Sequence, residues 1–150
     1  MKKHRPTPMD VEHRATIELP HDLGEVAIEV GDEHHQGAHH VQIRLPFAVD
    51  GRTLFRTTGG WAWLSTDRGQ LFLHDACVIL RVELADRTVS HLLPPPGEYF
   101  ADVEETATSF RCRLYGENPG FRWVELDKAS TPFAPGTGPV VEGRFPSAFP

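Results

Sequence analysis

The sequence predicts an all-β protein, built as an antiparallel β-sandwich or jelly roll of about 8–10 short strands. Apolar and polar residues alternate with a period of two in several segments, which is typical of strands with one buried face. Turn sequences separate these segments at a spacing of roughly ten residues, as in sandwiches and barrels. No long stretch keeps apolar residues at the spacing of an amphipathic helix.

Four segments show the alternation most clearly. Residues 25–30 and 41–49 carry apolar side chains at every second position, and residues 77–84 and 110–114 repeat the pattern. Because successive side chains of a strand point to opposite faces, each segment has one buried and one exposed side. Further strands are predicted over residues 13–19, 53–58, 61–66, 70–74, 88–93, 121–126 and 140–145.

Turn and breaker residues fall between these segments. Asp50-Gly51 and Asp67-Arg68-Gly69 are residue types that favour tight turns. Three prolines at 94–96 end a strand, because proline has no N–H for the ladder. A short helical turn is expected near Asp102–Ala107, where two glutamates favour a helix and no proline intervenes.

The 150 residues suit one domain with two distinct ends. Residues 1–9 are basic and proline-containing, and we expect a mobile arm there. Residues 10–130 form the predicted sandwich. Residues 131–150 are rich in proline and glycine, so most of this tail is unsuited to a central strand. The tail also holds Phe133, Phe145 and Phe149, and we expect it to lie extended over the domain; a flexible tail is the alternative.

Composition and charge narrow the function classes. The formal net charge is −6, which disfavours a nucleic-acid partner, since phosphate binding relies on Lys and Arg. No apolar run reaches the ~20 residues of a membrane-spanning helix, and no secretory signal is evident at the N-terminus. The two cysteines make neither a disulfide framework nor a zinc motif. We therefore expect a cytoplasmic protein with no membrane partner.

Four of the nine histidines lie within residues 34–40, between two predicted strands. Facing residues of an antiparallel pair share a face, so the numbers of paired residues must sum to an odd value here. A two-residue turn at Gln36-Gly37 gives a sum of 73, and a four-residue loop gives 75, which is less favoured because it opposes Glu29 to Pro46. The pairs predicted for 73 are Val30 with Ile43, Ile28 with Leu45, Val26 with Phe47 and Glu29 with Arg44.

This register predicts that His34 faces His39 and that Glu33 faces His40. Two imidazoles about 5 Å apart can share a metal ion, and a third ligand would come from Asp32, His40 or elsewhere. The same residues also suit a solvated hairpin tip, or a pH response through repulsion between imidazolium groups. The sequence contains no established metal-ligand motif, so we expect no resident cofactor, with a divalent metal as the alternative.

Two aromatic pairs and an arginine group are further candidates. Trp61 and Trp63 share one face of a predicted strand, either as a platform for a partner or, as we favour, within the core. Phe121 and Trp123 form a similar pair with the same expectation. Three arginines, at 111, 113 and 122, would form a basic cross-strand patch if residues 107–115 and 121–126 form a hairpin. A solvated face is the more common role of such arginines.

Motifs for catalysis are missing from the sequence. It contains no nucleophile elbow, phosphate loop, dinucleotide fingerprint or Cys-x-x-Cys pair. Cys77 and Cys112 lie in apolar surroundings and are interpreted as small buried hydrophobic residues. These observations argue against an enzyme.

Part of the second half resembles a known family. The run Val78-Ile79-Leu80-Arg81-Val82-Glu83-Leu84 is followed by a short strand and by Pro96-Gly97-Glu98-Tyr99. Over residues 77–126 this arrangement resembles the competence-nuclease inhibitor family of small bacterial β-sandwich proteins. The resemblance implies an acidic protein that binds stoichiometrically and does not catalyse a reaction.

The sequence therefore predicts a non-enzymatic β-sandwich that binds another protein, as an inhibitor or immunity-type protein. Candidate contact residues are Trp61, Trp63, Glu25 and Glu29, and acidic charge favours a basic partner. One alternative is a metal-dependent jelly-roll enzyme that uses the histidine hairpin. A second alternative is a structural assembly subunit whose two ends strap neighbouring copies together.

Overall fold

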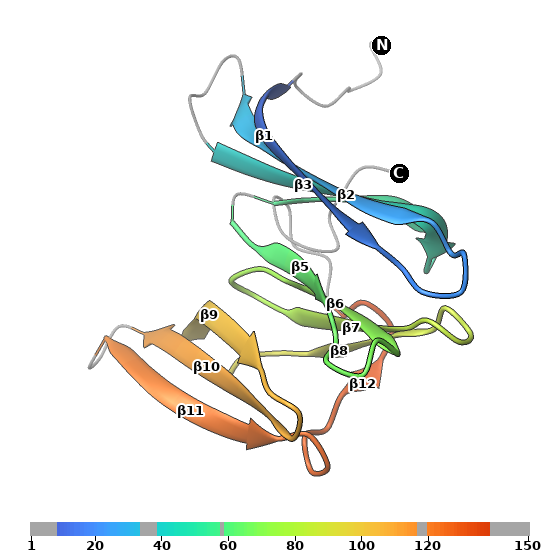
Figure 1. The fold of residues 1–150 in the computed structure, drawn as a ribbon. Helices are drawn as coiled ribbons and strands as arrows, with labels where there is room; N and C mark the ends of the chain where they lie inside the picture. The colour runs from blue at the N-terminus through green and yellow to red at the C-terminus, as the bar shows by residue number, and fades with distance from the viewer. Residues whose placement is uncertain (1–8, 34–38, 58, 117–119, 139–150) are drawn as a thin grey trace, which may run out of the picture.

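A computed structural model of the chain describes residues 9–33, 39–57, 59–116 and 120–138, of which 9–12, 32–33 and 39 are described by their backbone alone. Within these residues the protein contains strands and no helix, which confirms the all-β class. The strands form three antiparallel sheets stacked in three layers (Figure 1). The predicted sandwich is thus extended by a third layer, and the middle sheet is covered on both faces.

Each sheet is built from strands that are consecutive in the chain, with one exception. The strands of sheet A, in spatial order, are β1 (Met9–Glu18), β2 (Glu25–Glu33), β3 (His39–Val49) and β4 (Arg52–Thr57). Sheet B has the order β12 (Ala134–Pro135), β8 (Val89–Leu92), β7 (Ile79–Glu83), β6 (Gln70–His74) and β5 (Trp61–Leu64). Sheet C has the order β11 (Phe121–Asp127), β10 (Ser109–Gly116) and β9 (Glu98–Glu105). Only β12 joins a sheet out of sequence order.

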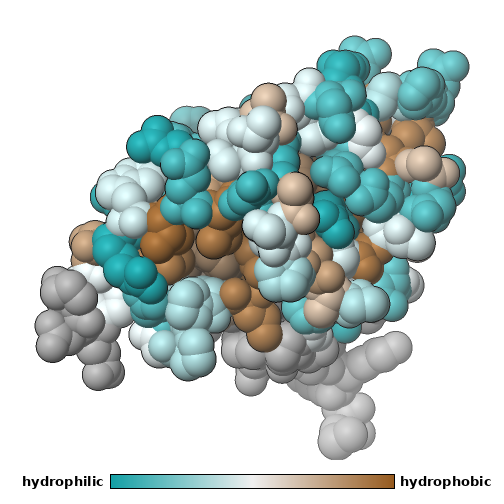
Figure 2. All heavy atoms as spheres, turned by 90° about the horizontal axis from the view of Figure 1, so that it is seen from below, coloured by the Kyte–Doolittle hydropathy of each residue, from teal (hydrophilic) through white to brown (hydrophobic). Residues whose placement is uncertain are grey.

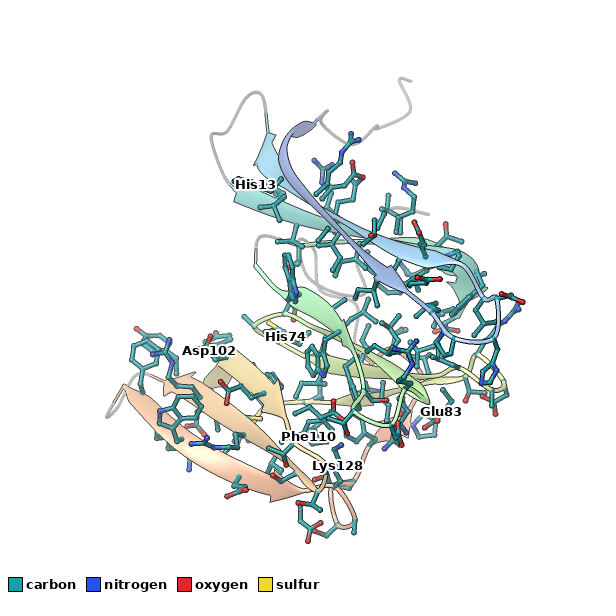
Figure 3. The ribbon with its side chains drawn as sticks, in the orientation of Figure 1. His13, His74, Glu83, Asp102, Phe110 and Lys128 are labelled. Atoms are coloured by element: carbon teal, nitrogen blue, oxygen red, sulfur yellow. The ribbon has the colours of Figure 1, made fainter. Side chains whose placement is uncertain are left out.

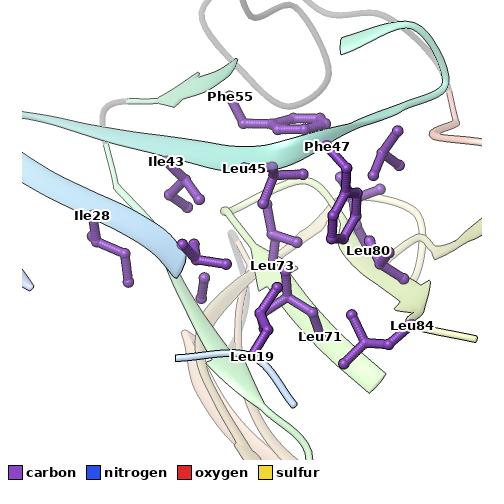
Figure 4. Packing of buried hydrophobic residues seen from close by; sticks show 14 of the residues in the cluster. Leu19, Ile28, Ile43, Leu45, Phe47, Phe55, Leu71, Leu73, Leu80 and Leu84 are labelled. Carbon is purple, nitrogen blue, oxygen red and sulfur yellow. The ribbon is translucent and has the colours of Figure 1, made fainter. Parts of the chain in front are cut away.

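Sheets A and B enclose the larger core. Alternate residues of β2 and β3 point into it, as their pattern predicts: Val26, Ile28 and Val30 from β2, and Val41, Ile43, Leu45, Phe47 and Val49 from β3. Leu71, Leu73 and Leu80 meet them from sheet B (Figure 4). These side chains are almost fully buried, and removing apolar surface from water is the main free-energy gain of such packing.

Sheets B and C enclose a second core on the opposite face of sheet B. Phe72 and Ile79 point toward sheet C and pack with Phe100, Phe110 and Leu114. Phe72 lies between two leucines that face sheet A, so three successive residues of β6 are buried. A strand buried on both faces has a continuous apolar sequence, which is the pattern Leu71-Phe72-Leu73 shows.

The predicted strands within the described residues are confirmed, with ends that differ by a few residues. The strand expected at 140–145 lies outside the described residues. The helical turn expected near Asp102–Ala107 is wrong, because β9 continues to Glu105. Glu104 and Glu105 pair with Arg111 and Phe110 of β10, and this ladder outweighs the weak helix propensity of glutamate.

The pairing of β2 with β3 differs from the predicted register. Val30 pairs with Val41 and Ile28 with Ile43, so paired numbers sum to 71 and the predicted sum of 73 is wrong. The odd sum itself is confirmed, since it only requires that apolar residues share a face. The predicted turn at Gln36-Gly37 lies outside the described residues. Glu29 therefore lies opposite Gln42, whose Nε2 donates to its carboxylate at 3.3 Å.

The described part of the tail packs on sheets B and C. β12 pairs with β8, and the Phe133 ring lies 5.9 Å from the Phe110 ring between centroids. The Arg81 guanidinium lies over the Phe133 ring, 4.3 Å from its centroid. Phe145 and Phe149 lie outside the described residues, as do residues 1–8 of the arm predicted over residues 1–9; its last residue, Met9, begins β1.

Candidate functional site

Sheet C turns one face toward sheet B and the other toward solvent. Along β10 the side chains of Phe110, Cys112 and Leu114 point inward, so Arg111, Arg113 and Tyr115 point outward. The register with β11 and β9 continues these rows across the sheet. The outward residues form three rows: Phe121, Tyr115 and Tyr99; Trp123, Arg113 and Asp102; Glu125, Arg111 and Glu104.

We call the outward residues Tyr99, Tyr115, Phe121 and Trp123 the aromatic face. Their exposed fractions are 48%, 47%, 57% and 53%, which make them four of the six large hydrophobic side chains most open to solvent in the described residues. A hollow of about 360 Å³ lies among Tyr99, Tyr115, Phe121 and Ala76. Isolated exposed aromatic residues are ordinary, but a contiguous group marks an interaction surface.

Each of the two outward arginines forms an ion pair and a cation–π contact. Arg113 forms an ion pair with Asp102 at 2.8 Å, and its guanidinium lies 4.5 Å from the Phe121 centroid. Arg111 lies 5.5 Å from the Trp123 centroid and 4.0 Å from Glu104. These contacts hold the aromatic rings in place and neutralise the arginines.

The structure corrects two sequence predictions here. Phe121 and Trp123 are exposed, not core residues, because Val124 and Leu126 occupy the inward positions of β11. The predicted hairpin exists, yet the three arginines do not form one basic patch. Arg122 pairs with the inward-facing Leu114, so it lies on the face opposite to Arg111 and Arg113, where Glu98 binds it with two hydrogen bonds.

A groove runs along the inward side of β11. It has a volume of about 380 Å³ and lies between β11 and the segment that follows β8. Its lining is apolar apart from one arginine: Leu92, Leu93, Pro94, Pro95, Phe100, Leu114, Arg122, Val124 and Leu126. On the side of the molecule seen from below, hydrophobic residues gather in a hollow with hydrophilic residues around it (Figure 2). Five of the six large exposed hydrophobic residues among the described ones lie on sheet C or line this groove.

The tryptophans that the sequence singled out lie elsewhere. Trp61 and Trp63 share a face of the edge strand β5, and Trp61 is 41% exposed. Trp63 belongs to the core between sheets B and C, where it stacks on Phe72 with centroids 5.3 Å apart. The carboxylate candidates lie on sheet A, where Glu25 is exposed and Glu29 forms an ion pair with Arg14 at 3.3 Å. These four residues do not form one surface with the aromatic face.

The histidine hairpin is described only at its base. His40 pairs with Gly31 and His39 with Asp32 through their backbones, so the predicted pairing of Glu33 with His40 is wrong. The predicted pairing of His34 with His39 involves His34, which lies outside the described residues. Residues 34–38 and the side chains of Asp32 and His39 lie outside the description. Among the residues whose side chains are described, no three His, Cys, Asp or Glu residues are grouped as a metal site requires.

A polar network around Glu105 joins sheets B and C beside the second core. The Glu105 side chain is only 2% exposed and accepts hydrogen bonds from Trp63 Nε1 and the Thr66 backbone N–H, both at 3.2 Å. Lys128 Nζ also binds it and lies 5.6 Å from the Phe110 centroid (Figure 3). A neighbouring cavity of about 560 Å³ is lined by Lys128, Arg81 and Asp67 among others.

Each charged group that lines this cavity is engaged by a neighbouring residue. Arg81 donates to Ser90 Oγ at 3.1 Å and lies 3.6 Å from Glu83. Hydrogen bonds from Ser65, and then from the Gly69 N–H, lower the pKa of Asp67. These hydrogen bonds and the ion pair hold the charged groups in place around the cavity.

Two other titratable groups lie between sheets B and C: His74, which is half-buried, and Cys112, which is buried in the second core. Burial lowers the pKa of His74, whose ring packs edge-on against Trp63 at 5.9 Å. Burial also raises the pKa of the Cys112 thiol to about 11, so this cysteine is a neutral hydrophobic residue near pH 7. That agrees with the interpretation of Cys112 from the sequence, whereas Cys77 is only half-buried.

No protein-family model, curated protein or solved structure matches this chain. Within the described residues no helix has the length and apolar character needed to cross a membrane. The aromatic face and the groove beside it are therefore assigned from their own geometry.

Proposed function

We propose that this protein binds another protein through the aromatic face of sheet C and catalyses no reaction. The observation that carries the proposal is the half-exposed group of Tyr99, Tyr115, Phe121 and Trp123 on one face of sheet C. Tyr, Trp and Arg dominate the binding energy of protein interfaces because they bury large, rigid surfaces and also offer polar contacts. The outward side of sheet C combines all three.

The arrangement of the rings favours a protein over a sugar or a nucleic acid. The Tyr115 and Phe121 rings are tilted by 50° to each other, so they do not form one plane on which a flat ligand stacks. Arginine groups lie over Phe121 and Trp123 and cover ring faces that a base would need. Asp102, Glu104 and Glu125 are on the same face and repel phosphate groups.

The kind of partner follows from the charge and from the sequence resemblance. The net charge of −6 accelerates encounters with a basic protein. Similarity of residues 77–126 to nuclease inhibitors suggests an inhibitor or immunity-type protein, whose target is a basic enzyme such as a nuclease. The aromatic face would then supply affinity, and the acidic balance would supply a fast association rate.

Affinity capture from the native host tests the proposal with matched variants. We expect the Tyr99→Ser/Tyr115→Ser variant to bind its partner about 30-fold more weakly than the wild type, because two central anchors are lost. Trp61→Ser, which changes an exposed tryptophan on another sheet, should bind normally. A partner captured equally by all three proteins, or no stable partner at low salt, would count against the proposal.

The two alternative functions stay predictions from the sequence. A metal-dependent enzyme would depend on His34 and His39, and His34 lies outside the described residues. Elemental analysis of untagged protein tests this alternative: stoichiometric zinc, iron or nickel, lost in a His34→Ala/His39→Ala variant, would replace our proposal. An assembly subunit would instead form large particles with the full chain and not with residues 10–130.

A further inference from the structure

The outer strands of the three sheets differ in how their free edges are protected. An unpaired strand edge offers N–H and C=O groups to another strand, and proteins usually block it with bulges, prolines, short strands or covering chain. β1 has a bulge between Val11 and His13, β5 has only four residues, and β12 has two residues and ends in Pro135. These three edges carry such devices.

Two further edges are occupied or covered. The register of β9 shifts next to Arg113, and the Phe100 N–H of β9 donates to the Ala76 carbonyl at 2.8 Å. The last three residues of β4 are buried, from Phe55 to Thr57. β11 is different: its seven residues contain no proline, and its pairing with β10 is regular from Ser109–Asp127 to Tyr115–Phe121. β11 carries charged side chains at Arg122, Glu125 and Asp127, but among the described strands it is the long edge that has no bulge, proline or covering chain.

We propose that β11 pairs with β11 of a second copy of this chain, so that two sheets C form one continuous antiparallel sheet. The self-pairing is complementary when Val124 lies opposite Val124 of the second copy. In that register all seven residues of each strand overlap. The facing pairs across the two-fold axis are Phe121 with Asp127, Arg122 with Leu126 and Trp123 with Glu125. No two like charges face each other, which matters because like charges directly opposite are destabilising.

The same register keeps the two faces of the sheet intact. Even-numbered residues of both strands point inward and odd-numbered residues outward, since the pairs join residues of equal parity. Val124 and Leu126 of one copy then extend the wall of the apolar groove of the other, beside Leu93, which is exposed in a single chain. The outward aromatic rows of the two copies also join into one surface. The dimer therefore covers apolar area and presents two partner sites side by side.

The mass of the purified protein in solution, measured over a concentration series, tests this pairing without any partner. One chain has a mass of 16.8 kDa, and we expect the protein to have twice this mass at high concentration. Trp123→Glu places the new carboxylate opposite Glu125 of the second copy, twice by symmetry, and should weaken dimerisation at least about 100-fold. Trp123→Lys introduces an attractive pair at the same two places and should remain dimeric. Trp61→Glu controls for adding a carboxylate at another exposed tryptophan.

Near-ultraviolet circular dichroism checks that each variant is folded. If Trp123→Glu does not fold, Trp123→Lys still tests the pairing. A wild type that is monomeric throughout the series would overturn the proposal. A dimer disrupted equally by Glu and Lys at position 123, or by neither, would overturn the Val124-centred pairing. The protein-binding proposal is independent of these results, because its variants at Tyr99 and Tyr115 do not lie on β11.

Discussion

Glu105 shows how one buried carboxylate can join two sheets. It comes from the end of β9, and its partners come from β5, from the turn after β5 and from the residue after β11. The charge is almost fully removed from water, so each hydrogen bond offsets part of a large desolvation cost. Its contacts fix sheet C against sheet B at the end of the second core.

Removing this carboxylate should be costly. Glu105→Ala leaves Lys128 and the Trp63 indole N–H without their partner, and we expect a loss of about 3 kcal/mol in the free energy of unfolding. Glu105→Gln keeps an acceptor and should lose less. Urea denaturation of these variants and of Glu105→Leu/Lys128→Met checks the prediction. A double variant less stable than Glu105→Ala would show that the pair is not the source of the effect.

His74 gives the second core a dependence on pH. Burial lowers its pKa below the ordinary value of 6.5, while the neighbouring Asp75 and Asp102 oppose this shift in part. Figure 3 shows His74 on sheet B and Asp102 on the neighbouring sheet C. When the pH falls below 6.5, an unfolded chain binds a proton at His74 that the folded protein does not yet bind. The free energy of unfolding therefore decreases from about pH 6.5 down to the folded pKa and then levels off.

We expect His74→Gln to remove this part of the pH dependence. The urea midpoint of the wild type should fall more steeply than that of the variant between neutral pH and pH 5, whatever their difference at neutral pH. His13→Gln, which changes an exposed histidine on sheet A, provides the matched control. Parallel curves for wild type and His74→Gln would contradict the assignment.

At the level of elements, the sequence predicts most strands and misses some of their partners. Alternation identifies β2, β3, β7 and β10, because one buried face imposes a period of two. The β2–β3 register is not determined in this way, because every odd sum keeps the same faces together. The helical turn expected near Asp102–Ala107 fails because propensity is a local quantity, and β9 is set by its neighbour β10.

The aromatic face was predictable only in part. Tyr115 follows the outward arginines of β10 at the same spacing, so the alternation itself places it on the exposed side. Phe121 and Trp123 were assigned to the core because large aromatic side chains usually are buried. Their exposure depends on which face of β11 packs on sheet B, and Val124 and Leu126 determine that face. Only the hairpin register with β10 brings Tyr115, Phe121 and Trp123 together.

Gly60 lets β5 approach β6 closely at the start of their pairing. Its φ is +138°, and a Cβ at this position would lie 2.1 Å from the His74 carbonyl oxygen. Gly60→Ala should therefore separate the strands and lower the free energy of unfolding by more than about 3 kcal/mol. Gly51→Ala is the control, because φ is +77° there and the new methyl group meets nothing within 4 Å. It should cost about 1 kcal/mol in the same denaturation experiment.

At the scale of the whole molecule, the three layers predict an order of local stabilities. Sheet B is packed on both faces, whereas sheets A and C each leave one face in water. We expect backbone amides of β6 and β7 to exchange with deuterium most slowly, at rates set by global unfolding. Those of β1, a bulged edge strand, should exchange much faster. Equal protection of β1 and β6 in exchange mass spectrometry would contradict a layered distribution of stability.

The position of sheet B in the chain has a consequence for synthesis on the ribosome. Its strands β5 to β8 end at Leu92, and the residues of sheet C that pack on Phe72 and Ile79 begin only at Phe100. A nascent chain that has emerged up to Leu92 can form the core between sheets A and B. The apolar face of sheet B that later packs on sheet C is then still exposed to water. Truncated chains that end between sheet B and sheet C should therefore be the most prone to aggregate and to bind chaperones.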